Sequence, residues 1–117
     1  MESFNEPYRE TREWGSFIRF SKNTSSTVKL LTVNAGQAFS LQKHQKREEG
    51  WFVISGNGVI QMGEERNDIE VGKTYFIPKE TLHRLEAGDE AVVVLEVSFG
   101  EFDEKDITRL DDRYGRS

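Results

Sequence analysis

Short apolar runs, separated at close intervals by turn residues, are the feature of this sequence that most limits its fold. β-branched and aromatic residues dominate the runs, which is typical of strands. The strongest run covers residues 91–99 and is rich in valine. Glycine, asparagine and aspartate fill the connections, for example at residues 55–58 and 87–90. Many short strands at this spacing predict an antiparallel sandwich or barrel.

Helical periodicity is weak along the whole chain, and the sequence predicts no more than a short helical turn near residues 103–107. A chain of 117 residues has the length of one domain with one modest core. We therefore predict an all-β single domain over residues 1–117. It consists of a polar N-terminal arm at residues 1–12, a barrel at residues 13–100 and a C-terminal extension at residues 101–117.

The composition argues against several classes of function. The formal net charge is −5 and no basic face is evident, which argues against nucleic-acid binding. The chain has no cysteine, so it contains no disulfide, thiolate metal site or cysteine nucleophile. No apolar run approaches the ~20 residues of a membrane span, and the first residues are too polar for a secretory signal. We expect a cytoplasmic protein that does not bind a membrane.

The two histidines, His44 and His83, each lie at the edge of a predicted strand. Gln42 and His44 are spaced i, i+2, so on a strand they face the same side. A polar stretch then allows the chain to turn, so that Glu49 can return to the same interior from the next strand. Two imidazoles, one carboxylate and one amide oxygen suit a divalent Zn, Fe, Mn, Co or Ni ion. We predict a metal site with open positions for water or substrate.

The same residues fall into two segments that resemble the two motifs of the cupin family. The matching positions are residues 36–44 with Glu49 and Gly56, and residues 72–78 with His83. Gln42 stands where most cupins have their first histidine. The resemblance implies a double-stranded β-helix, a jelly-roll-like barrel, in which Gln42, His44, Glu49 and His83 hold the metal.

Within the cupins, the chain resembles the type II mannose-6-phosphate isomerase domain from about residue 11 to residue 116. The matching segments are residues 12–16, 40–44, 47–51, 77–78, 83–86 and 111–116. In that family the domain is often fused behind a mannose-1-phosphate guanylyltransferase, and this sequence has no Gly-rich phosphate loop of such a domain. The chain departs from the family pattern at six positions: Gln45, Lys46, Glu48, Gly50, Glu80 (a usual glycine) and Ala87.

The resemblance implies interconversion of mannose-6-phosphate and fructose-6-phosphate, with a metal that stabilises the enediolate. Candidates for the general base are Glu48, Glu80 or a metal-bound hydroxide. Arg47 is the first choice for holding the phosphate, followed by Lys46 and Arg84; the alternative for Arg47 is a surface salt bridge with a neighbouring glutamate. The predicted catalytic residues are thus Arg47, Glu48 and Glu80.

Two alternative hypotheses about the function remain. The chain could be a metal-binding cupin that binds a small sugar or acid, or a regulatory module, because the histidines around the family's site are replaced. It could also be a metal-free structural protein. Five aromatic residues are predicted to pack in the core rather than to stack on a sugar: Trp14, Trp51, Phe52, Tyr75 and Phe76. Because an open barrel has edge strands that need covering, we further expect a homodimer with the N-terminal arm, including Trp14, at its interface.

Overall fold

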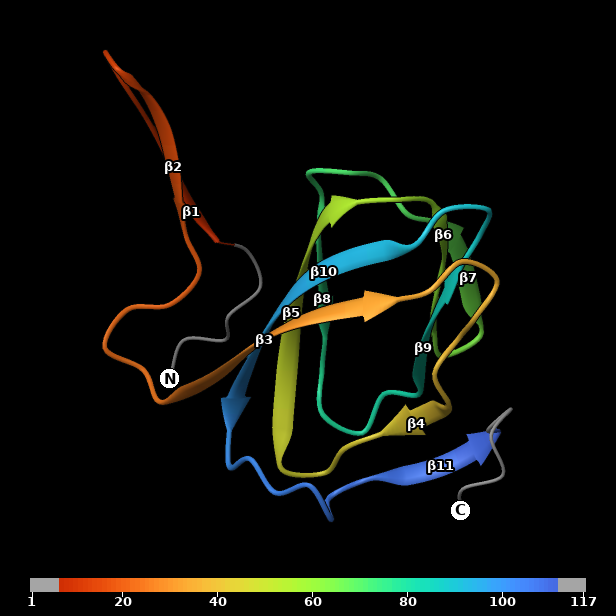
Figure 1. The fold of residues 1–117 in the computed structure, drawn as a ribbon. Helices are drawn as coiled ribbons and strands as arrows, with labels where there is room; N and C mark the ends of the chain where they lie inside the picture. Colours follow the sequence, from red (N-terminus) through yellow and green to blue (C-terminus); the bar gives the residue numbers. More distant parts are fainter. Residues whose placement is uncertain (1–6, 112–117) are drawn as a thin grey trace.

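The structure is a computed structural model that describes residues 7–111, and every regular element in that range is a β-strand (Figure 1). The strands are β1 (Tyr8–Arg12), β2 (Gly15–Arg19), β3 (Ser26–Val33), β4 (Leu41–Lys43), β5 (Arg47–Ser55), β6 (Gly58–Met62), β7 (Glu65–Asp68), β8 (Thr74–Ile77), β9 (His83–Ala87), β10 (Val92–Gly100) and β11 (Thr108–Asp111). The all-β prediction is confirmed. The residues described form no helix long and apolar enough to cross a membrane.

Two sheets enclose the interior. One has the strand order β3-β10-β5-β8 and the other the order β11-β4-β9-β6-β7, while β1 and β2 form a separate hairpin. Within the described residues, all pairings between named strands are antiparallel. The chain passes from one sheet to the other between β4 and β5 and again between β8 and β9. Those two crossings bring the predicted metal ligands toward each other.

The interior is apolar at one end and polar at the other. On β5 the inward positions read Arg47, Glu49, Trp51 and Val53, so the strand changes from charged to apolar along its length. The antiparallel strand β10 has the matching order, with Ser98 and Glu96 beside the charged end and valines beside the apolar end. Burial of each large apolar side chain there contributes roughly 1.5–3 kcal/mol. The core therefore supports one end of the barrel and leaves the other for polar chemistry.

The five predicted core aromatics divide into three groups: two are buried, Phe52 and Phe76 are half-buried, and one is exposed. Trp51 and Tyr75 are buried, as expected. Phe52 points to the outer face of its sheet, where its ring packs edge-on against Phe20 at 5.5 Å. The prediction for Trp14 was wrong: its side chain is 72% exposed at the tip of the β1–β2 hairpin, which stands off to one side of the sheets in Figure 1. The residues around Trp14 form a tight hairpin and pair with no strand of the barrel.

The C-terminal extension contributes a strand to the second sheet, because β11 pairs with β4. Arg84 holds this strand in place. Its guanidinium donates to the main-chain oxygens of Phe39 (3.0 Å) and Asp111 (2.8 Å), and it also lies 3.0 Å from an Asp111 carboxylate oxygen. The predicted helical turn near residues 103–107 is a hydrogen-bonded turn without a helix, closed by the Asp106 N–H on the Asp103 carbonyl.

Candidate metal centre

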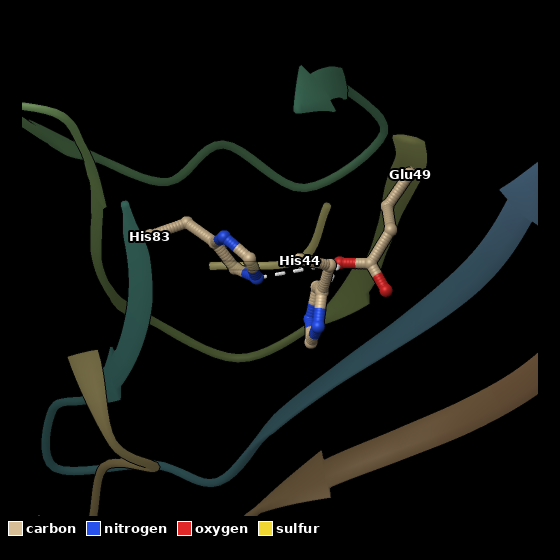
Figure 2. A group of neighbouring side chains, drawn as sticks. All are labelled: His44, Glu49 and His83. Atoms are coloured by element: carbon tan, nitrogen blue, oxygen red, sulfur yellow. Dashed lines mark ion pairs between the residues drawn. The ribbon is translucent and has the colours of Figure 1, made fainter. Parts of the chain in front are cut away.

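Three of the four predicted ligands, His44, Glu49 and His83, lie together at the polar end of the barrel (Figure 2). One ligand atom from each residue lies within 4.8 Å of the others, and all three side chains are at most 5% exposed. His44 follows β4, Glu49 belongs to β5, and His83 begins β9. Burying three titratable side chains costs free energy unless each finds a charged or hydrogen-bonding partner.

The outer nitrogen of each imidazole is bound to a main-chain oxygen. His44 Nδ1 lies 2.7 Å from the Asp106 carbonyl, and His83 Nδ1 lies 2.9 Å from the Thr81 carbonyl. A carbonyl can only accept a hydrogen bond, so each Nδ1 carries the proton in the neutral ring. Each Nε2 then carries a lone pair, which is the form that a metal requires.

Both Nε2 atoms face the same carboxylate oxygen. Glu49 Oε1 lies 3.3 Å from His83 Nε2 and 4.0 Å from His44 Nε2. Oε1 is buried and accepts no hydrogen bond from the described residues. Lone pairs on nitrogen and oxygen do not attract each other, so a proton or a cation must lie between them. The unpartnered Glu49 oxygen and the lone pairs of the two imidazole Nε2 atoms therefore fit a divalent metal ion.

The second Glu49 oxygen is held by the protein. Oε2 accepts from Arg47 Nε and from Ser98 Oγ, both at 3.3 Å. Arg47 is 7% exposed, and its Nη2 lies 3.2 Å from His44 Nε2. The remaining guanidinium nitrogen donates to the Asp103 carbonyl, and the group lies 4.5 Å from the Phe102 ring centre. Arg47 is therefore a buried part of the centre, not a surface salt bridge.

The electrostatics favour a charged Glu49 beside a neutral His44. Burial alone would raise the pKa of Glu49, but the close approach of His83, together with His44 and Arg47, lowers it to about 2. Burial lowers the pKa of His44 below its ordinary value, against the opposing effects of the Asp106 carbonyl and Glu49. Near neutral pH, the cluster thus presents an anionic oxygen and an unprotonated His44 ring.

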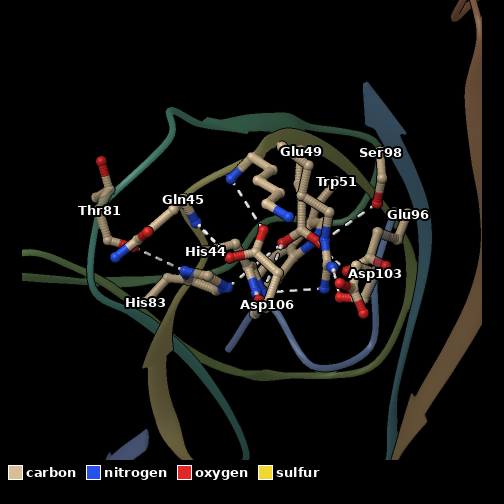
Figure 3. Close-up of polar contacts among 12 residues, drawn as sticks. His44, Gln45, Glu49, Trp51, Thr81, His83, Glu96, Ser98, Asp103 and Asp106 are labelled. Atoms are coloured by element: carbon tan, nitrogen blue, oxygen red, sulfur yellow. Dashed lines mark hydrogen bonds and ion pairs between the residues drawn. The ribbon is translucent and has the colours of Figure 1, made fainter. Parts of the chain in front are cut away.

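Glu96 is a buried acid that the sequence reasoning missed. It lies on β10, is 6% exposed, and accepts a hydrogen bond from Trp51 Nε1 at 3.1 Å (Figure 3). Burial and the nearby charge of Glu49 raise its pKa to about 7. The sequence did contain a signal for this residue. Glu96 lies two and four positions after Val94 and Val92 in an otherwise apolar run, so on a strand it points to the same buried side as they do.

Gln42, the fourth predicted ligand, lies beside the cluster. It pairs directly with His83 across β4 and β9, and directly opposed residues project to the same face of a sheet. Gln42 and His44 were expected to face the same side of one strand, but β4 ends at Lys43, before His44. Gln42 instead lies next to His83 on the neighbouring strand.

The other predicted site residues lie outside the cluster. Glu48 stands between Arg47 and Glu49 on β5, so strand alternation directs its side chain to the opposite face. Arg84 faces away from its neighbour His83 in the same manner and is occupied by β11. The structure does not bring Glu48 or Arg84 to the metal ligands.

The remaining two lie on the surface. Lys46 is exposed, and its Nζ lies 3.8 Å from a Glu101 carboxylate oxygen. Glu80 is also exposed and has a positive φ of 62°, and its N–H donates to the His44 carbonyl at 2.7 Å. Glu80 thus borders His44 through its main chain.

Comparison with known proteins agrees with this architecture. The chain has the fold of a cupin protein from Bacteroides fragilis, with a TM-score of 0.61 and 20% identity over 71% of this chain and 75% of that one. It also matches a structure described as a putative sugar phosphate isomerase from Acidithiobacillus ferrooxidans, with a TM-score of 0.60 and 23% identity over 67% of this chain and 51% of that one. The predicted cupin barrel is confirmed.

Sequence comparison is more specific. The xanthan biosynthesis protein XanB of Xanthomonas campestris is 35% identical over 91% of this chain and 23% of its own length. The mannose-1-phosphate guanylyltransferase RfbM of Salmonella typhimurium is 33% identical over 91% of this chain and 22% of its own length. The chain thus spans less than a quarter of these curated relatives. The family model described as mannose-6-phosphate isomerase C-terminal matches residues 2–112. The chain belongs to this family of mannose-6-phosphate isomerase C-terminal domains.

Proposed function

We propose that the chain binds a divalent metal ion of the Zn, Mn, Fe, Co or Ni group through His44, Glu49 and His83, with Gln42 as the fourth ligand. The observation that carries the proposal is the convergence of two imidazole Nε2 atoms on a buried carboxylate oxygen without a hydrogen-bond partner among the described residues. Elemental analysis of the purified protein tests it directly. About one metal ion per chain would support the site, and none would favour a metal-free structural protein.

We further propose that this centre interconverts mannose-6-phosphate and fructose-6-phosphate. The family of the chain and the described role of the Acidithiobacillus neighbour support this reaction class. The metal supplies a Lewis acid for the sugar oxygens when it is bound. Arg47 borders the ligand nitrogen of His44, so its guanidinium is placed to donate to a substrate oxygen beside the metal. A coupled assay with each sugar phosphate, in which metal-loaded protein gives no turnover, would refute the isomerase proposal.

The three residues predicted to bind the phosphate already have other partners, and this favours a second candidate function. Arg47 is buried and bound to Glu49, Arg84 is occupied by β11, and Lys46 is exposed beside Glu101. None of the three therefore offers a free cation at the cluster. A metal cupin that binds an unphosphorylated sugar or acid fits this arrangement. Mannose raising the melting temperature of the metal-loaded protein as much as mannose-6-phosphate does would favour the second candidate.

Glu80 provides a test of the general base. Its positive φ of 62° costs a non-glycine residue about 1 kcal/mol, so we expect Glu80→Gly to raise the free energy of unfolding by about that amount. If Glu80 carries the proton, the same change lowers kcat by about 100-fold or more. We expect both effects: a more stable and slower protein, measured by urea unfolding and the coupled assay. Glu80→Gly with an unchanged kcat would remove Glu80 from the mechanism and leave it as a turn residue.

We also propose that two copies of the chain form a dimer through the β1–β2 hairpin and β3. An isolated hairpin is marginally stable in water, and Trp14 at its tip is exposed. The edge strand β3 exposes Val28 (59%) and Leu30 (63%). By sedimentation analysis, we expect the native chain to be a dimer and Leu30→Glu to be a monomer, while Leu110→Glu, at an equally exposed apolar position on β11 of the other sheet, remains a dimer. A monomeric native chain would contradict this proposal.

A further inference from the structure

The turn segment formed by residues 101–107, between β10 and β11, lies against the metal centre (Figure 3). Three of its residues contact the cluster. The Phe102 ring lies against the Arg47 guanidinium, the Asp103 carbonyl accepts from Arg47, and the Asp106 carbonyl accepts from His44. The segment is distant in sequence from both His44 and Arg47, so the fold alone brings these contacts together.

Asp106 has the most contacts with His44 and the residues after it. Its carboxylate oxygens accept hydrogen bonds from the main-chain N–H groups of Gln45 and Lys46, each at 2.9 Å. These residues directly follow His44, which lies outside any strand and whose carbonyl accepts from the Glu80 N–H. The main-chain oxygen of the same aspartate lies 2.7 Å from His44 Nδ1. One residue therefore fixes both the backbone after His44 and the orientation of its ring.

The ring contact selects the tautomer. The Asp106 carbonyl can only accept, so it favours a proton on His44 Nδ1 and a lone pair on Nε2. Arg47 can only donate, and its Nη2 lies 3.2 Å from Nε2, which requires the same tautomer. In this form the Nε2 lone pair faces Glu49 Oε1, and a metal would bind it in place of the Arg47 donor. Groups that orient a metal-binding histidine through its other nitrogen typically change metal affinity 10- to 100-fold when they are removed.

We propose that Asp106 is a positioning residue of the metal centre: its carboxylate fixes the chain after His44, so that its carbonyl holds the His44 ring as the Nδ1–H tautomer. This inference rests on the proposed metal site. It assigns a role to a residue of the C-terminal segment that is not itself a ligand. The side chain acts indirectly, because substitution leaves the carbonyl in the chain but removes the two hydrogen bonds that place it.

The test uses Asp106→Ala, which removes both acceptors, and Asp106→Asn, which keeps one amide oxygen. Glu104→Gln is the matched control, because Glu104 is an exposed acidic residue of the same turn. Calorimetric titration of the chelator-treated full chain with Co²⁺ should show about 10- to 100-fold weaker binding for Asp106→Ala. We expect a smaller loss for Asp106→Asn and no change for Glu104→Gln. Urea unfolding establishes that each variant is folded, and Asp106→Asn carries the test if Asp106→Ala is not.

A second measurement needs no metal. Long-range ¹H–¹⁵N correlation spectra at pH 8 report which His44 nitrogen carries the proton. We expect the Nδ1–H form in the native chain and in Glu104→Gln, and a mixture of tautomers in Asp106→Ala. If Asp106→Ala and Asp106→Asn both keep the native tautomer and the native Co²⁺ affinity, the positioning role is wrong. A native chain that binds no Co²⁺ but shows the tautomer change would refute the metal centre while retaining the role of Asp106.

Discussion

Glu49→Gln is expected to lose the stable metal binding that we propose for this centre. Oε1 of Glu49 is the anionic donor between the two imidazoles, and the amide that replaces the carboxylate has no charge to offer a divalent ion. Loss of a residue that only orients a ligand typically weakens binding 10- to 100-fold, so loss of this ligand should exceed about 100-fold. The measurement is metal content per chain after gel filtration, together with a Co²⁺ titration of the chelator-treated protein.

Glu48→Gln is the matched control for this variant. Glu48 is the adjacent residue on β5 and faces the other side of the sheet, so its substitution changes the formal charge equally without touching the ligands. The native chain and Glu48→Gln should both gain melting temperature when Co²⁺ is added, whereas Glu49→Gln should not. Because Glu49→Gln also deprives the buried Arg47 of its anionic partner, its intrinsic stability must be measured without metal. A native-like metal content in Glu49→Gln would contradict the assigned centre.

The sequence identified the four candidate ligands, but not how the strands bring them together. The strands and turns could be read from residue types, and the spacing of Gln42, His44, Glu49 and His83 indicated a shared interior. Alternation along a strand would also have separated Glu48 from Glu49, and Arg84 from His83, had the strand bounds been known. Those bounds depend on which sheet each segment joins, and local patterns do not fix them.

Long-range contacts could not be predicted from the sequence. Asp106 reaches His44 across 62 positions, and Arg84 holds β11 through Asp111. Both contacts depend on the path of the chain after β10. Residues 101–107 form an irregular turn there, and their sequence has no regular spacing of apolar residues from which that path could be predicted. Arg47 was placed in the site by resemblance, but its burial against Glu49 and Phe102 became evident only in the fold.

The titration of Glu96 is expected to make the free energy of unfolding depend on pH. Burial and the charge of Glu49 raise the pKa of Glu96 from the ordinary 4.5 to about 7. The folded protein therefore holds a proton that the unfolded chain has already released between these two values. The free energy of unfolding should fall as pH rises through this window, because the folded state binds more protons there than the unfolded state. Below about pH 4.5 the full contribution of neutral Glu96 is present, and above about pH 7 it is lost.

Glu96→Gln should remove that loss. The amide oxygen can still accept from Trp51 Nε1, and the amide N–H can donate to Glu49, so the variant retains the contacts of the neutral acid. At 1.36 kcal/mol for each unit of pKa, we expect Glu96→Gln to be more stable than the native chain by roughly 3 kcal/mol at pH 8. Near pH 4.5 the difference should be close to zero. Urea unfolding of chelator-treated native and variant chains at both pH values measures it, and subtraction removes the titration of all other groups. Equal stability of the two chains at pH 8 would contradict the raised pKa of Glu96. It would mean that the protein stabilises the Glu96 carboxylate as an anion, which requires a cationic group near it inside the barrel.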